Sequence, residues 1–179
     1  MNDTNKIFDG LLVLQYRSGD RRAMGLLVRK YHKRLCNHAF FYTNDIHASK
    51  DIVQDCWGVI INKLNGLRNP NLFGSWAFKI VIHKSLDYVE KQKKELNRLH
   101  EYHKSKITGD SAKDNKDNLT KLYSMIKTLP KEQQIVLRLF YTENYTLKEI
   151  ADILKISIGT VKSRLFYARE KLKSIVKYK

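Results

Sequence analysis

Apolar residues recur three and four positions apart in several stretches of the chain, which is the spacing of amphipathic helices. In the first half this pattern runs over 20–35 and then from 44 or 45 to 64. Pro70 disfavours a helical conformation in the residue before it, so the second helix is expected to end before this point. A third helix is predicted over 73–93.

The second half of the chain has the same helical character. A helix predicted over 119–129 stops at Pro130, whose fixed backbone angle suits the first turn of a further helix over 132–141. No stretch sustains the alternation of apolar and polar residues that a strand shows. The chain is therefore predicted to be all-α.

The interval between the two halves has a different composition. Residues 95–118 contain few large apolar side chains and many Lys, Asp and Asn residues. Such a stretch cannot bury enough surface to fold, so a flexible linker is predicted there. The sequence thus predicts two small helical domains, over 1–94 and 119–179, joined by a linker over 95–118.

The charge of the chain narrows the classes of partner. The 179 residues include 34 Lys and Arg against 18 Asp and Glu, a net charge of +16. Residues 1–93 hold 15 basic and 8 acidic residues, and residues 124–179 hold 12 and 5, so each half carries +7. A chain this basic favours a polyanionic partner, nucleic acid above all.

Other features exclude several classes of protein. With 8 Gly and 2 Pro, the chain has neither the turns of an all-β protein nor the glycine-rich loop of a Rossmann or P-loop enzyme. No signal peptide or membrane-length apolar run is visible, which predicts a cytoplasmic chain without membrane insertion. Cys36 and Cys56 form no metal-binding pair and are interpreted as reduced thiols in helix cores. No metal site and no cofactor are expected.

The most specific motif begins at Thr146. Thr146 and Glu149 have the spacing of a capping box, in which two side chains accept hydrogen bonds from free backbone N–H groups at the start of a helix. Lys155 and Ile156 form a short turn, and Ser157 is a favourable N-cap for the next helix. This arrangement is typical of a helix-turn-helix, whose second helix enters the major groove of DNA.

The second helix of this motif has one apolar face and one face suited to DNA. Val161, Leu165 and Ala168 share the core-facing side. On the outer side, Lys162 can bond guanine and Phe166 can contact a thymine methyl group. The residues predicted to contact duplex DNA are Ser157, Gly159, Thr160, Lys162, Ser163, Arg164, Phe166, Tyr167, Arg169 and Lys171. An amphipathic helix with a solvated basic face is the less favoured alternative.

These motifs together resemble the small, extracytoplasmic-function-type sigma factors of bacterial RNA polymerase. The segments that resemble region four of this family are Leu129–Gln134, Glu149–Ala151, Gly159–Leu165 and Ala168–Leu172. The segments that resemble region two are Asp51–Asp55 and Trp76–Ile80, with Asp87 and Tyr88. The resemblance covers nearly the whole chain except the linker.

The resemblance implies a binding function without catalysis. In this family, region four docks on the flap of the β subunit and reads the minus-35 element as duplex. Region two docks on the clamp helices of the β′ subunit and captures the melted minus-10 strand. The chain is then no enzyme but the subunit that gives core RNA polymerase its promoter specificity. The family also implies an anti-sigma factor as a partner, and the free chain is expected to be a monomer.

Asp51, Gln54 and Asp55 match the helix of region two that binds core polymerase. Helical spacing places the three residues on one face, and such an acidic patch suits a basic partner surface. From the residues alone, an ordinary solvated helix face is the preferred interpretation. The resemblance is what favours polymerase binding.

The helix around Trp76 combines basic and aromatic residues, as proteins that bind single-stranded DNA do. Asn69 and Phe73 are expected in the preceding loop, where a flipped base could be held, and core packing of Trp76 is an equal alternative. Ile82 and His83 stand where the family commonly has Arg-Asn, so a different base preference is expected. The residues predicted at the minus-10 strand are Asn69, Phe73, Trp76, Lys79, His83, Lys84 and Lys91.

Two other classes of protein remain as alternatives. A conventional helix-turn-helix regulator with an N-terminal sensing or dimerisation domain predicts stable dimers on palindromic sites without polymerase. A nucleic-acid-processing enzyme predicts a cluster of acidic or metal-binding residues, and no such cluster is visible in the sequence.

Overall fold

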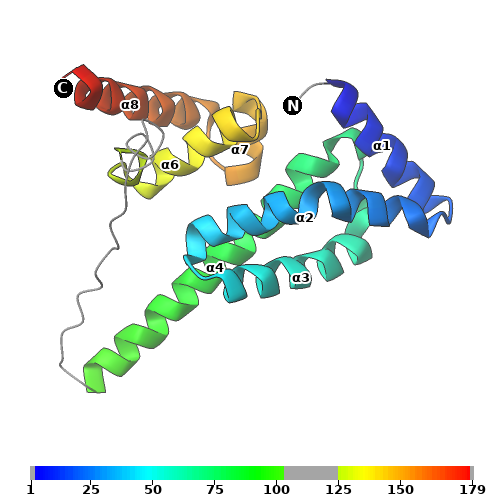
Figure 1. Ribbon diagram of the computed structural model, residues 1–179, viewed down its shortest axis with the longest axis horizontal. Helices are drawn as coiled ribbons and strands as arrows, with labels where there is room; N and C mark the ends of the chain where they lie inside the picture. The colour runs from blue at the N-terminus through cyan, green and yellow to red at the C-terminus, as the bar shows by residue number, and fades with distance from the viewer. Residues whose placement is uncertain (1–2, 103–124, 178–179) are drawn as a thin grey trace, which may run out of the picture. The chain divides into compact units, whose positions relative to one another are not determined.

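The structure is a computed structural model that describes residues 3–102 and 125–177, and every regular element in these two ranges is a helix (Figure 1). The chain divides into two compact units, unit 1 (Met1–Lys106) and unit 2 (Ile107–Lys179). Each unit is described by itself. The prediction of an all-α chain made of two helical domains is confirmed.

The described part of unit 1 consists of four α-helices and two short 3-10 turns. In chain order they are α1 (Asp3–Arg17), α2 (Arg21–Thr43), α3 (Ile46–Lys63), η1 (Leu64–Gly66), η2 (Pro70–Leu72) and α4 (Phe73–Tyr102). Helices α2, α3 and α4 pack against one another, and α1 packs on α2 and η2. The short turns between α3 and α4 thus lie beside α1 although they follow it by some fifty residues.

Polar side chains start the two central helices where the sequence predicts them. The Asp20 carboxylate accepts a hydrogen bond from the backbone N–H of Arg22 at 2.9 Å, and Asp45 accepts one from His47 at 2.7 Å. Asn44 ends α2 with a φ of 52°, a left-handed conformation that asparagine tolerates. The connection between α2 and α3 therefore consists of only two residues, Asn44 and Asp45.

The core of unit 1 forms where α2, α3 and α4 meet. Its fully buried side chains include Tyr31, Ile60, Phe73 and Phe78. The Tyr31 ring meets the rings of Phe73 and Phe78 edge-on, with centroids 5.4 and 6.5 Å away, which is a favourable aromatic arrangement. Gly74 permits this packing, because a Cβ atom there would lie 2.5 Å from the Tyr31 hydroxyl.

Helix α4 continues beyond its predicted end. It runs from Phe73 to Tyr102, so residues 95–102 are helical and do not belong to a linker. On its exposed end Glu90 and Lys94 form an ion pair of 2.7 Å one turn apart. A polar composition predicts that a segment stays at the surface, but a surface segment can be a helix as well as a coil. The predicted linker start is therefore wrong, and the remainder, 103–118, lies outside the described residues.

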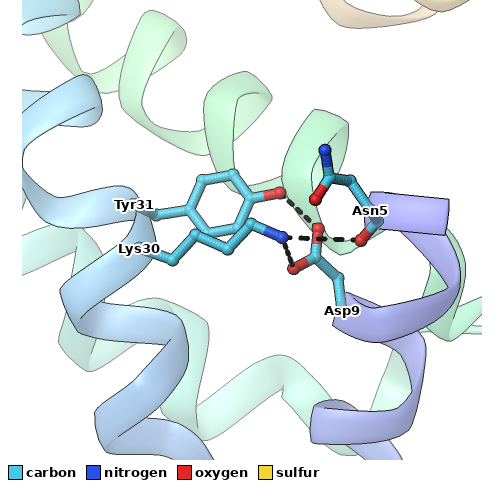
Figure 2. A network of polar contacts seen from close by, with 4 residues as sticks. All are labelled: Asn5, Asp9, Lys30 and Tyr31. Atoms are coloured by element: carbon cyan, nitrogen blue, oxygen red, sulfur yellow. Dashed lines mark hydrogen bonds and ion pairs between the residues drawn. The ribbon is translucent and has the colours of Figure 1, made fainter. Parts of the chain in front are cut away.

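Helix α1 has no counterpart among the predicted helices, and polar contacts hold it in place (Figure 2). The buried Asp9 carboxylate accepts a hydrogen bond from the Tyr31 hydroxyl at 2.5 Å and pairs with the Lys30 ammonium at 2.7 Å. Arg17 donates to two backbone carbonyls of the 64–67 segment, at 2.6 and 2.7 Å. The helix is thus fixed to α2 at its middle and to the α3–α4 connection at its end.

The described part of unit 2 begins with a helical turn over 125–127 and continues with α6 (Lys131–Leu137), η3 (Arg138–Thr142), α7 (Leu147–Leu154) and α8 (Ile158–Lys177). Segment η3 is a π-helix, in which the N–H of Glu143 donates to the carbonyl of Arg138, five residues earlier, at 3.1 Å. The helix predicted over 132–141 is thus observed as α6 continued by a π turn. Of the helix predicted over 119–129, residues 119–124 lie outside the described residues.

The core of unit 2 lies between α6, α7 and α8. Leu139, Ile150 and Val161 are buried there. Gln134 is also buried, and its side-chain amide donates to the backbone carbonyl of Leu129 at 2.7 Å, which ties the turn before α6 to that helix. Among the helices of the two described ranges, none carries an apolar stretch long enough to cross a membrane.

Candidate functional site

The connection between α7 and α8 has the predicted helix-turn-helix geometry. The Thr146 hydroxyl accepts a hydrogen bond from the N–H of Glu149 at 3.3 Å, and the Glu149 carboxylate accepts one from the N–H of Thr146 at 2.9 Å. Lys155 closes α7 in the left-handed conformation, with a φ of 55°. Ser157 then caps α8 by accepting from the N–H of Thr160 at 3.0 Å. These local bonds fix the angle between the two helices.

Helix α8 buries one face and exposes the other, as its spacing predicts. Val161, Leu165 and Ala168 are buried on the side that packs against α6 and α7. On the outer side, Phe166 is 59% exposed and Tyr167 is 62% exposed, and their ring centroids lie 5.5 Å apart. The other exposed residues predicted on this side are Gly159, Lys162, Ser163 and Glu170. Exposed rings among polar and basic residues form a surface suited to base edges and methyl groups.

Three hydroxyl groups at the start of α8 are engaged within the helix. The hydroxyls of Ser157 and Thr160 lie 2.9 Å apart and share a hydrogen bond. The Ser163 hydroxyl donates to the backbone carbonyl of Thr160 at 3.0 Å. Because the hydroxyl proton of Ser163 is used in this bond, its oxygen can only accept a hydrogen bond from a base. The amino groups of adenine and cytosine are suitable donors. Ser157 and Thr160 therefore cap the helix, and Ser163 is left as a candidate for base contact.

Arg169 is held by two aromatic residues that the sequence pattern does not single out. Its Nε donates to the Tyr141 hydroxyl at 2.8 Å. Its guanidinium also lies 5.6 and 5.5 Å from the ring centroids of Phe140 and Tyr141, within cation–π range. The hydrogen bond uses Nε, and a phosphate can be bound through the terminal nitrogens. Tyr141 precedes Arg169 by 28 residues, so no local spacing could have linked them.

The other basic residues of α8 differ in their surroundings. Lys162 is exposed, whereas Arg164 is half-buried. Lys171 donates to the backbone carbonyl of Thr128 at 3.3 Å, and Lys173 pairs with Glu170 at 2.8 Å. Lys171 thus connects α8 to the turn before α6 and is engaged within unit 2.

The exposed face of α3 carries the residues predicted to bind polymerase. Asp51, Gln54 and Asp55 are all exposed there. Gly58 continues this face by one turn, and a side chain added at that position would meet no atom within 4 Å. Ile61 follows and is also exposed. A glycine inside a helix lowers its stability, and its lack of a side chain lets another backbone approach α3 closely.

The face of α4 predicted to bind single-stranded DNA is partly exposed. Trp76, Lys79 and His83 are half-buried, and Lys84 and Lys91 are exposed. A half-buried indole packs with one part and presents the other part to solvent. Core packing and ligand contact, the two interpretations of Trp76, are therefore compatible.

The structure contradicts the predicted position of Phe73. This residue is the first of α4 and is 0% exposed, because its ring packs edge-on against Tyr31. Pro70 begins η2, which runs directly into α4, so Phe73 belongs to the helix and not to the loop before it. Phe73 is therefore a core residue and cannot hold a base. Asn69 does precede η2, where its side-chain oxygen accepts from the N–H of Asn71 at 3.0 Å.

The described ranges contain no group of three or more His, Cys, Asp or Glu side chains that could hold a metal ion. Both cysteines are free thiols; Cys56 is buried and Cys36 is half-buried. Burial raises the pKa of Cys56 to about 12 and also raises the pKa of Cys36. Such thiols are protonated at neutral pH and are poor nucleophiles and poor metal ligands.

Two family models match the two units of the chain. Residues 119–172, which include α6, α7 and most of α8, match the model described as Sigma-70, region 4. Residues 27–95, from α2 to α4, match the model described as Sigma-70 region 2. The chain belongs to the sigma-70 family. Its helix-turn-helix is therefore part of sigma region four, and the exposed faces of α3 and α4 belong to sigma region two.

Individual relatives agree with this assignment. The RNA polymerase sigma factor SigV of Bacillus subtilis is 29% identical over 130 residues, which cover 73% of this chain and 76% of SigV. The ECF RNA polymerase sigma-E factor of Escherichia coli is 24% identical over 183 residues, which cover 93% of each chain. The sigma factor RpoE of Bartonella quintana, solved in complex with the anti-sigma factor NepR, shares the fold. It aligns with a TM-score of 0.68 at 19% identity, covering 86% of this chain and 96% of RpoE.

The chain is thus an RNA polymerase sigma factor of the extracytoplasmic-function type. Sigma-70 proteins are non-catalytic transcription initiation factors.

Proposed function

We propose that this sigma factor binds core RNA polymerase through α3 and reads promoter DNA through two further faces. Helix α8 reads the minus-35 element as duplex, and α4 holds the melted minus-10 strand. The observation that carries the proposal is the outer face of α8, where Lys162, Ser163 and Phe166 are exposed on a helix fixed by its caps.

Each residue of α8 has a role that follows from its surroundings. Lys162 donates to the O6 and N7 atoms of guanine, Ser163 accepts from a base amino group, and Phe166 packs on a thymine methyl group. Arg169, oriented by the Tyr141 hydroxyl at 2.8 Å, binds a phosphate and so sets the position of the helix along the groove. Base contacts therefore supply sequence specificity, and the phosphate contact supplies affinity.

The two faces of unit 1 serve different partners. The carboxylates of Asp51 and Asp55 attract a basic partner surface, which we propose to be the clamp helices of the β′ subunit. Gly58, which has no side chain, lets that partner approach α3 closely. On α4, the exposed part of Trp76 stacks on an unpaired base, while the nearby lysines follow the phosphates. The remaining minus-10 contacts proposed are Asn69, Lys79, His83, Lys84 and Lys91.

The setting of this function follows from the same proposal. The chain acts in the cytoplasm, where polymerase and DNA are found, and it catalyses no reaction itself. Region four contacts the β flap, and the residues between 102 and 119 connect the two DNA-reading domains. An anti-sigma factor is a proposed further partner, because the structurally similar RpoE of Bartonella quintana forms a complex with NepR.

Reconstitution with core polymerase tests the proposal. The full chain is added to core RNA polymerase of the same organism, and holoenzyme formation and promoter-specific transcription are measured. Asp51→Arg is expected to weaken core binding and to leave the affinity of the free chain for a minus-35 duplex unchanged. Glu95→Arg makes the same change of charge on the exposed end of α4 and serves as the matched control.

Two results would overturn the proposal. Failure of the unmodified chain to join core polymerase would remove the sigma function, and unchanged core binding by Asp51→Arg would remove the role of α3. Stable dimers on a palindromic duplex in the absence of polymerase would favour a conventional helix-turn-helix regulator.

A further inference from the structure

Helix α1 is oriented with a charged residue inward and large apolar residues outward. Its inward side carries Asp9, which is fully buried, together with the buried Leu12 and Val13, whereas Ile7, Phe8, Leu11 and Leu14 are each between 50% and 55% exposed. These four residues are called the α1 stripe. An amphipathic helix that packs on a core normally presents polar residues on its outer side. Several large apolar side chains exposed side by side indicate a surface that another molecule covers.

Polar contacts explain how α1 keeps this orientation. Asp9 is bonded to Tyr31 and Lys30, and Lys30 also lies 3.5 Å from the backbone carbonyl of Asn5, as Figure 2 shows. Gly10 lies against Asn71 so closely that any Cβ atom would overlap the asparagine side chain. The helix therefore cannot rotate to bury the stripe without breaking a buried ion pair.

The spacing of the stripe indicates a helical occupant. Ile7, Leu11 and Leu14 are separated by four and then three residues, as successive d, a and d positions of a coiled coil are. Side chains at this spacing form a straight seam along one helix, and a second helix packs into such a seam. Phe8 lies next to the seam.

Helix α2 meets the stripe through Lys30, and its exposed side is strongly basic. The Lys30 ammonium lies 5.4 Å from the centroid of the Phe8 ring. Four exposed residues share one side of α2, at successive intervals of four, three and four residues. They are Arg22, Leu26, Arg29 and Lys33. Apart from Leu26, which extends the apolar surface, this face carries only positive charge. The three cations are called the α2 basic face.

We propose that the α1 stripe and the α2 basic face together bind an amphipathic helix of another protein that carries acidic residues along one edge. The apolar side of that helix covers the seam, and its acidic edge faces Arg22, Arg29 and Lys33. All three cations belong to α2, which packs on α1, and a helix with one acidic edge matches a surface that combines apolar residues of one helix with cations of the other. This inference does not depend on the proposed mode of promoter recognition.

Charge argues against two other occupants. A second copy of the chain would bring another +16, so self-association through this face is opposed by repulsion. A membrane-binding helix carries cations on both borders of its apolar face, so that they can reach headgroups while the apolar side chains insert. In α1 the inward side carries the carboxylate of Asp9, and the cations belong to another helix.

The proposal can be tested with designed peptides and the full chain. The probe is a fluorescent helical peptide with leucines at a and d positions and glutamates along one edge, and its control has lysines in place of the glutamates. Fluorescence anisotropy is expected to detect binding of the acidic peptide only. Leu11→Glu and Arg29→Glu should each weaken this binding by about tenfold or more, since each places a negative charge against the acidic edge.

A matched control separates the stripe from other exposed leucines. Leu96 on α4 is 53% exposed, compared with 54% for Leu11, so Leu96→Glu makes the same change elsewhere on unit 1 and should leave peptide binding intact. Equal binding of both peptides, or equal effects of Leu11→Glu and Leu96→Glu, would overturn the proposal. So would a dimer that Leu11→Glu dissociates in sedimentation velocity, or binding to phosphatidylglycerol vesicles that Leu11→Glu abolishes.

Discussion

Asp9 joins α1 to α2 through an ion pair whose two members differ in their access to water. The carboxylate is fully buried, whereas a quarter of the Lys30 side chain is exposed. Lys30→Met would leave a buried carboxylate with the Tyr31 hydroxyl but without its counter-ion. Asp9→Asn would leave an ammonium that can turn toward water. We therefore predict that Lys30→Met destabilises unit 1 more than Asp9→Asn does.

The size of the two losses follows from these contacts. Removing one partner of a buried ion pair costs about 3–5 kcal/mol when the other charge stays buried, which is the case for Lys30→Met. In Asp9→Asn the amide oxygen can still accept from the Tyr31 hydroxyl, so the loss is closer to that of one charged hydrogen bond, about 1.5–3 kcal/mol. The double variant removes both charges and should lose less than the sum of the two single losses.

Urea unfolding of the full chain measures these differences. The chain has 2 tryptophans, and both Trp57 and Trp76 lie in unit 1, so their fluorescence reports on that unit alone. Lys94→Met, which breaks the exposed pair with Glu90, is the matched control and should leave the free energy of unfolding nearly unchanged, because an exposed ion pair contributes little. If Asp9→Asn costs as much as Lys30→Met, or if the two losses are additive, the reasoning about this pair is refuted.

Three further outcomes can be measured on the full chain. Lys162→Ala is expected to reduce discrimination between matched and mismatched minus-35 duplexes by about 1–3 kcal/mol in anisotropy titrations; an equal loss on both duplexes would contradict base contact. Arg169→Ala should weaken binding to every duplex and reduce the magnitude of the slope of log affinity against log salt by about one. Tyr141→Phe should also lower the affinity for every duplex, but by less. Full affinity in Tyr141→Phe would mean that the arginine needs no orienting partner. Cys56, whose pKa burial raises to about 12, should resist iodoacetamide in the folded chain at neutral pH and react once urea unfolds unit 1; rapid labelling of the folded chain would contradict its burial.

The helix-turn-helix could be predicted from the sequence because its determinants are neighbours in the chain. Thr146 and Glu149 are three residues apart, as are Ser157 and Thr160, and each pair forms the predicted bonds. Asp45 likewise caps α3 through the residues that follow it. Where residues within one turn decide the local structure, the sequence pattern contains the information.

Features that depend on distant residues could not be predicted in this way. Asp9 meets its partner Lys30 21 residues later, so periodicity alone could not reveal a helix that buries a carboxylate and leaves Ile7, Leu11 and Leu14 exposed. The burial of Phe73 depends on its packing against Tyr31 of α2, and no local signal in the sequence encodes that contact. Composition predicts a linker over residues 95–102, which are helical, because composition reports burial and does not report whether an exposed segment is helical.

The π turn over 138–142 has a consequence for how this sigma factor tolerates changes in length. A π turn contains one more residue than an α-helical turn, so deleting one residue there would restore an ordinary α-helix. The residues on one side of the deletion would then rotate by roughly 100° about the helix axis relative to the other side. Tyr141 would no longer be aimed at Arg169. The contact between Arg169 and Tyr141 thus depends on the length of this turn as well as on the two side chains, and a scan of point substitutions would not reveal that dependence.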